Sequence, residues 1–147
     1  MATLTEILLN DESRPRVEAD CAALIEREVA SKGGVSGFAI KAAFKTIKVF
    51  KRDIVPDAVH HLLPEFVANL EPIYAEHQAA GGGDVKAYAV TQSERIADAL
   101  LSITDGRAER SKHTTLVKAY RSLRPRGREQ VIQAMPAVGD MLMKNGA

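Results

Sequence analysis

The fold class is decided by the segment SGFAIKAAFKTIKVFKR, which comprises residues 36–52. Successive residues of an α-helix are about 100° apart, so side chains three, four and seven positions apart share a face. One stripe is apolar, continues just beyond the segment, and consists of Ile40, Ala43, Ile47, Phe50 and Ile54. A second stripe is entirely basic and consists of Lys41, Lys45, Lys48 and Arg52. The segment is therefore predicted to be a helix that begins with Ser36 as its N-cap and has one apolar and one basic face.

The same helical spacing of apolar residues recurs before this segment. Thr3 and Glu6 have the spacing of a capping box ahead of a short apolar stretch. The next helix is predicted to begin at Pro15, because the first helical turn tolerates proline, and to end at Gly33-Gly34. No run of β-branched and aromatic residues alternates with polar ones, so no strand is predicted.

Three prolines, Pro56, Pro64 and Pro72, lie eight residues apart in the following stretch. A proline inside a helix removes one backbone hydrogen bond and clashes with the preceding turn. We therefore expect residues 55–80 to form short helices joined by sharp corners, or one helix kinked at each proline.

Further helices are predicted toward the end of the chain. One is capped by Asp84 and closed by Gly106. Another surrounds residues 116–123 and ends at an arginine-rich corner around Pro125, and two short helices split by Pro136 follow it. The predicted fold is all-α: a compact single-domain bundle over residues 1–147, with about six to eight helices, several of them short and started or kinked at prolines.

Size and composition narrow the class of protein. The chain has 147 residues, a net charge of +1, no tryptophan, and Cys21 as its single cysteine, which cannot form an internal disulfide. The start of the chain lacks the basic and apolar regions of a signal peptide, and no stretch approaches the ~18 apolar residues of a transmembrane segment. A cytoplasmic location is expected.

The charges are sorted into blocks along the chain. Residues 29–52 carry six bases and no acid, and residues 106–128 carry eight bases and Glu109 alone. Residues 1–28 carry seven acids against three bases, and residues 53–105 carry nine acids against two. Either the basic elements lie against the acidic ones inside the fold, or basic surface is kept for an anionic partner. The sequence leaves both alternatives open.

Several short motifs together resemble a known family. They are Ser36-Gly37 with Ala39-Ile40-Lys41, the proline-punctuated run from Pro56 through Leu62-Leu63-Pro64 to Leu70-Glu71-Pro72, and Leu123-Arg124-Pro125. This pattern is similar to a family of small uncharacterised bacterial proteins and covers most of the chain. The resemblance implies a bacterial origin and carries no function.

The sequence gives little support for catalysis, a cofactor or a metal. His61 and Glu65 have helical spacing, but Pro64 lies between them and no established zinc motif is present. Cys21 lies on an apolar seam, where burial raises the pKa of a thiol and makes it unreactive. No catalytic residue, cofactor or metal site is predicted, and the protein is expected not to be an enzyme.

The two basic blocks therefore carry the predicted function, a non-enzymatic binding module that engages an anionic partner. The candidate partner-binding residues are Lys41, Lys45, Lys48 and Arg52 in a basic ridge, and Arg121, Arg124, Arg126 and Arg128 around the arginine corner. The candidate partners are an acidic protein, an anionic lipid surface or nucleic acid, and an oligomer is compatible with the sequence. Few aromatic residues interleave with these bases, so no stacking platform for nucleic acid is visible.

An alternative function is a helical carrier of an apolar small molecule or lipid. Proline corners in segment 55–80 would hold helices apart around a pocket, with the flexible Met135, Met141 and Met143 as its lining.

Overall fold

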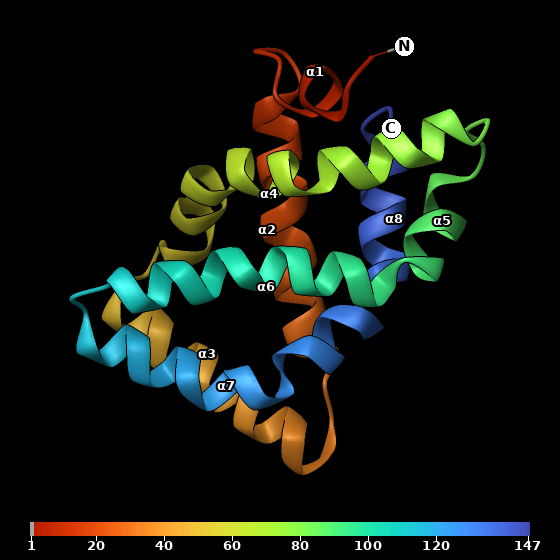
Figure 1. Cartoon of the computed structure of the whole chain (residues 1–147). Coiled ribbons are helices and arrows are strands. Elements are labelled where there is room, and N and C mark those ends of the chain that lie inside the picture. Colours follow the sequence, from red (N-terminus) through yellow and green to blue (C-terminus); the bar gives the residue numbers. More distant parts are fainter. Residues whose placement is uncertain (1) are drawn as a thin grey trace.

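In the computed structural model the chain forms eight α-helices and no strand over residues 2–147, the part that the structure describes (Figure 1). The all-α fold and the number of helices are as predicted. The helices are α1 (Leu4–Leu8), α2 (Arg14–Ser31), α3 (Gly34–Phe50), α4 (Ile54–Ala79), α5 (Val85–Thr91), α6 (Ser93–Arg110), α7 (Thr114–Gln133) and α8 (Met135–Lys144).

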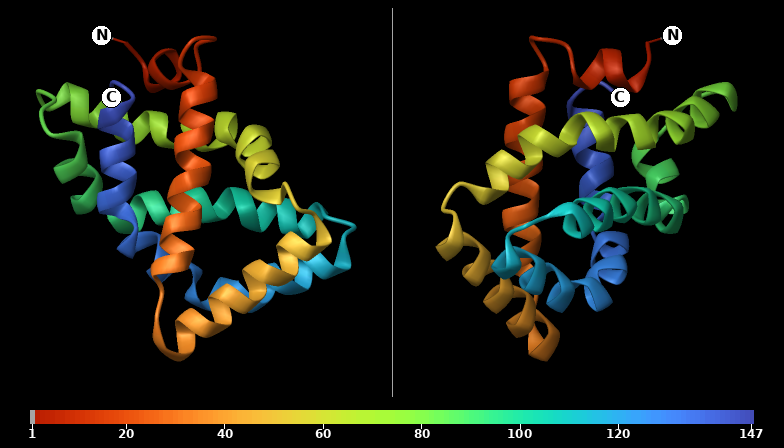
Figure 2. Two further views of the ribbon diagram at one scale, coloured as in Figure 1. Left: turned by 180° about the vertical axis from the view of Figure 1, so that it is seen from behind. Right: turned by 60° about the vertical axis from the view of Figure 1, so that its left-hand side comes forward.

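The helices are arranged around α2 and α4. Helix α4 packs against α1, α2 and α6, while the short α5 packs against α8. Seen from behind, α2 runs the length of the molecule from α1 to the turn before α3 (Figure 2). Helices α3 and α7 lie side by side at the far end from α1 (Figure 1).

The hydrophobic core lies at the α1 end of the molecule. Its largest fully buried side chains are Leu4, Leu8, Val17, Val67 and Met135. One cluster joins α1, α2, α4, α5 and α8, and a second joins α4, α5, α6 and α8. Within the described residues, neither cluster includes a buried side chain of α3 or α7.

The five-residue helix α1 is fastened to α4 by one carboxylate. The backbone N–H groups of Leu4 and Thr5 donate hydrogen bonds to the Glu71 carboxylate at 2.8 and 3.0 Å. Burial alone would raise the pKa of Glu71, but these hydrogen bonds outweigh it and lower the pKa. A helix this short is not stable alone, so its two buried leucines and this carboxylate hold it in place.

Several predicted helix ends are confirmed. Thr3 accepts a hydrogen bond from the N–H of Glu6, and Asp84 accepts one from the N–H of Ala87. Prolines lie in the first turns of α2 and α8. The turn between α2 and α3 uses Gly34 with a φ of +70°, a conformation that favours glycine.

Residues 55–79 form a single helix, as in the second of the two alternatives, and not short helices joined by sharp corners. Helix α4 runs without interruption through Pro64 and Pro72. Pro64 has no N–H to donate to the carbonyl of His60, and the Arg14 guanidinium donates to that carbonyl instead, at 3.0 Å. A partner from another helix therefore supplies the hydrogen bond that the proline removes. A kink at each proline stays a prediction.

The prediction of a corner at the arginine-rich segment is wrong. Residues 124–128 lie inside α7, which continues through Pro125 to Gln133. The predicted boundaries of α3 change too, because the helix begins at Gly34 with Gly33 as its N-cap, two residues before Ser36.

The helix predicted between Asp84 and Gly106 is divided in two. Helix α5 ends at Thr91, α6 begins at Ser93, and α6 continues past Gly106 to Arg110. The break allows α5 to pack closely on α8, where a Cβ at Gly139 would lie 2.7 Å from Cα of Lys86. The helical spacing of apolar residues continues from α5 into α6, so this spacing does not reveal the change in direction between them.

Candidate functional site

The two basic blocks of the sequence become neighbours in the fold. The first block contains all of α3 and the second contains most of α7, and these helices pack against each other in opposite directions (Figure 1). Their pairing gathers many of the positive charges of the chain into a single layer.

Small side chains allow this layer to form. The buried residues of α3 are Gly37, Ile40 and Ala43, and the one buried residue of α7 is Ala119. A Cβ at Gly37 would lie 2.6 Å from the backbone carbon of Lys32, so only glycine lets the start of α3 fold back so closely on the end of α2. The predicted core positions Ile40 and Ala43 are thus confirmed.

Three of the eight predicted cations form ion pairs with acids on neighbouring helices. These pairs are Lys48 with Glu26 of α2 at 2.6 Å, Arg124 with Asp105 of α6 at 2.8 Å, and Arg128 with Asp98 of α6 at 2.8 Å. The hydrogen bond from Arg124 lowers the pKa of Asp105, and that from Arg128 lowers the pKa of Asp98. The side chains of all three pairs are partly exposed, so solvent screens each pair and its contribution to stability is small.

The other five predicted cations have no such partner. Within the described residues, no carboxylate lies within ion-pair distance of Lys41, Lys45, Arg52, Arg121 or Arg126. The two alternatives left open by the sequence therefore apply to different residues. The three cations whose side chains reach an acid of α2 or α6 are paired, while the other five are not.

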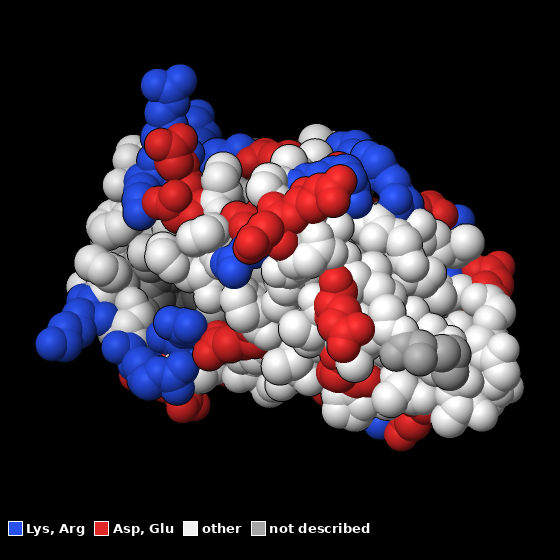
Figure 3. All heavy atoms as spheres, turned by 90° about the horizontal axis from the view of Figure 1, so that it is seen from above, with Lys and Arg blue, Asp and Glu red and all other residues white. Residues whose placement is uncertain are grey.

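Charges of both signs also lie on other parts of the molecule. On the face seen in Figure 3, acidic side chains are spread over the middle and basic ones gather mainly near one end and along one edge. Bridges between helices, such as Arg107 of α6 with Glu65 of α4 at 3.0 Å, contribute to this pattern.

The outer side of α3 is apolar, which the sequence analysis missed. Val35 is 85% exposed, Phe38 is 76% exposed and Val49 is 81% exposed. At about 100° per residue these three side chains share one face, opposite the buried Ile40. The signal was present, because α3 has a second apolar stripe besides the one that was assigned to the core.

Lysines flank this apolar stripe on both sides. Lys41 and Lys45 line a hollow of about 360 Å³ between α2 and α3. On the other side, Lys118 lines a hollow of about 510 Å³ between α3 and α7. Lys118 was not among the predicted site residues, and only the packing of α7 on α3 reveals its place. We call the surface formed by Val35, Phe38, Val49, Lys41, Lys45 and Lys118 the α3 face.

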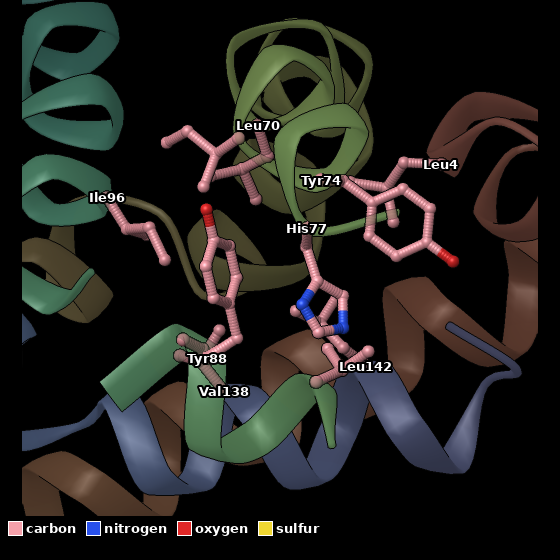
Figure 4. A pocket seen from close by; sticks show the side chains of 11 residues that line it. Leu4, Leu70, Tyr74, His77, Tyr88, Ile96, Val138 and Leu142 are labelled. Carbon is pink, nitrogen blue, oxygen red and sulfur yellow. The ribbon is translucent and has the colours of Figure 1, made fainter. Parts of the chain in front are cut away.

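Segment 55–80 lines a small cavity in the core, but Met135, Met141 and Met143, the predicted lining of a carrier pocket, are not among its lining residues. Its volume is about 30 Å³, and segment 55–80 contributes Leu70, Ile73, Tyr74 and His77 to its wall. Figure 4 shows the His77 and Tyr88 rings side by side at this cavity, with their centroids 4.5 Å apart. Pockets for small molecules measure about 300–1,000 Å³, whereas this cavity holds about one water molecule.

Two titratable side chains in or beside the core are Cys21 and His77. Burial raises the pKa of the Cys21 thiol to about 11. His77 is buried, and its Nε2 lies 3.3 Å from the carbonyl oxygen of Gly83. Over residues 2–147, no three histidine, cysteine, aspartate or glutamate side chains are placed to hold a metal ion.

Comparison with protein families gives one match. The model of DUF6918, a family of unknown function, matches residues 4–146. The chain belongs to this family. No curated protein and no solved structure matches it. Membership of DUF6918 confirms the predicted resemblance to an uncharacterised family, while a bacterial origin stays a prediction. None of the described helices is long and apolar enough to span a bilayer.

Proposed function

We propose that this member of DUF6918 is a non-enzymatic binding module that engages an anionic partner through α3 and α7. One observation carries the proposal: two adjacent helices present unpaired cations, and α3 contains no acidic residue at all. Lys41 and Lys45 are four residues apart and repel each other by a few tenths of a kcal/mol. Such a surface costs stability unless an anion lies opposite.

The alternative of an apolar carrier receives less support. A cavity of about 30 Å³ would have to open roughly tenfold to hold a small molecule. Most of the side chains that line it belong to one or other of the two core clusters, so opening the cavity would cost much of the core packing.

The proposal is tested by retention on immobilised heparin, a soluble polyanion, at increasing salt. We expect the variant with Lys41→Gln, Lys45→Gln and Lys118→Gln to elute at clearly lower salt than the parent, because each lost contact reduces the electrostatic attraction.

The matched control carries Lys86→Gln, Lys112→Gln and Lys144→Gln, which remove the same charge outside the α3 face. Lys86 and Lys144 pair with Asp140 and Asp20 on α8 and α2. The control is expected to elute close to the parent. Equal losses in both variants would show that net charge alone governs retention, and no retention of the parent would reject the proposal.

A further inference from the structure

We infer that the anionic partner is a lipid bilayer surface, onto which the α3 face docks with its apolar stripe. This inference rests on the proposed function and adds a role for side chains that a purely electrostatic contact would not need. Val35, Phe38 and Val49 are all more than three-quarters exposed. Exposure of apolar surface to water is unfavourable, so covering these side chains would lower the free energy.

The order of side chains across the α3 face matches the interface of a bilayer. The apolar stripe occupies the outermost line of α3 and extends about 21 Å along it, from Val35 to Val49. Lys41 and Lys45 border it on the α2 side, and Lys118 lies on the α7 side. Helices that lie in a membrane interface place apolar side chains among the acyl chains and lysines among the phosphates.

The shape of the face favours a bilayer over a protein partner. Its apolar side chains stand on a convex helix and are far more exposed than residues sunk in a groove. A fluid bilayer adapts to such a ridge, whereas a protein would need a complementary groove lined with acids.

A second copy of the chain is a poor occupant of this face. Closed dimers place the same patch of both subunits in contact. The lysines of one α3 would then meet those of the other, and α3 offers no acid to pair with them. Charge complementarity therefore points to a separate anionic surface.

The natural absence of tryptophan gives a direct test. Phe38→Trp places a single fluorescent reporter on the α3 face, and Val90→Trp places one at an exposed apolar position on α5. With vesicles of phosphatidylcholine and phosphatidylglycerol, we expect the emission of the first variant to shift to the blue and to be quenched by brominated lipids. The emission of the second is expected to stay unchanged.

Loss of the apolar stripe provides a second measurement. The double variant Phe38→Ser and Val49→Ser should bind these vesicles at least about tenfold more weakly, because less apolar surface is transferred from water into the bilayer. Its retention on heparin should equal that of the parent, because its cations are intact. Vesicles of phosphatidylcholine alone should bind the parent weakly.

Three outcomes overturn the inference while leaving the proposed function in place. The parent is retained on heparin through Lys41 and Lys45 but does not bind anionic vesicles. Vesicles bind, but the emission of the tryptophan at position 38 does not change, so charge alone holds the protein. An acidic amphipathic peptide binds the α3 face and the vesicles do not. If neither heparin nor vesicles bind, the proposed function itself fails.

Discussion

The α1 end of the molecule and the α3–α7 layer bury different kinds of side chain. Around α1 and α4, large residues such as Leu8, Val67 and Met135 are almost completely buried. Between α3 and α7, contact is made mainly through small residues such as Ala43 and Ala119, while Phe38 faces outward. The largest buried side chains and the unpaired cations of α3 and α7 therefore lie in separate parts of the fold. The first region contains the hydrophobic core clusters, and the second carries the surface that we propose binds a partner.

The two regions are expected to differ most in the free energy of unfolding that is lost when a large apolar side chain is shortened. Met135→Ala removes a side chain that is 0% exposed and should lower the free energy of unfolding by about 2–5 kcal/mol. Phe38→Ala removes a larger side chain from the α3 face, yet it should change that free energy by no more than about 0.5 kcal/mol. Urea unfolding of both variants measures this. A loss at Phe38 comparable to that at Met135 would show that α3 is packed as tightly as the core.

An intermediate effect on stability is expected at low pH, and it concerns the ion pairs that attach α7 to α6. Asp98 and Asp105 have lowered pKa values because Arg128 and Arg124 donate hydrogen bonds to them. Their contribution to stability is fully present above the pKa of an aspartate in the unfolded chain, which is about 4. It is lost as the pH falls through the lower pKa that each aspartate has in the folded protein. The free energy of unfolding should therefore be steady from neutral pH to about pH 5 and decline below about pH 4.

The variant with Asp98→Asn and Asp105→Asn isolates this attachment. It should be less stable than the parent at pH 7 and indistinguishable from it at a pH below the lowered pKa values of both carboxylates, where the parent has also lost both charges. A stability difference that is the same at both pH values would mean that the two carboxylates act through packing and not through their charge.

The smallest effect is expected within the basic ridge and separates its paired and unpaired members. Lys41→Gln with Lys45→Gln should leave the free energy of unfolding unchanged or raise it by a few tenths of a kcal/mol, because repulsion is relieved. Lys48→Gln loses the contact with Glu26 and should lower it by up to about 1 kcal/mol. Thermal unfolding at low salt measures both. If the double variant is the less stable one, Lys41 and Lys45 support the fold.

Features set by nearby residues were the ones that the sequence predicted well. The caps at Thr3 and Asp84, and the buried positions Ile40 and Ala43, depend on hydrogen bonds and spacing within a few residues. The break at Gln92 accompanies the packing of α5 on α8, and the continuity of α4 at Pro64 accompanies a hydrogen bond from Arg14, 46 positions before His60. Such long-range partners leave no local pattern in the sequence.

The candidate site was predicted only in part for the same reason. The two blocks of cations were visible in the sequence, but the pairing of Lys48, Arg124 and Arg128 depends on which acidic helix lies beside each. Phe38 belongs to an apolar stripe with the same helical spacing as the stripe that is buried. Its exposure therefore follows only from the way α3 packs on α7.

The hydrogen bond between Arg14 and the carbonyl of His60 has a consequence for how this sequence can vary. Arg14 replaces the donor that Pro64 lacks, so the two residues, 50 positions apart, depend on each other. With alanine at position 64, the backbone N–H can serve His60 and Arg14 loses that task. The cost of Arg14→Ala should therefore be smaller in a Pro64→Ala background than in the parent, by an interaction energy of about 0.5 kcal/mol or more. Members of DUF6918 that lack this proline are accordingly expected to tolerate other residues in place of the arginine.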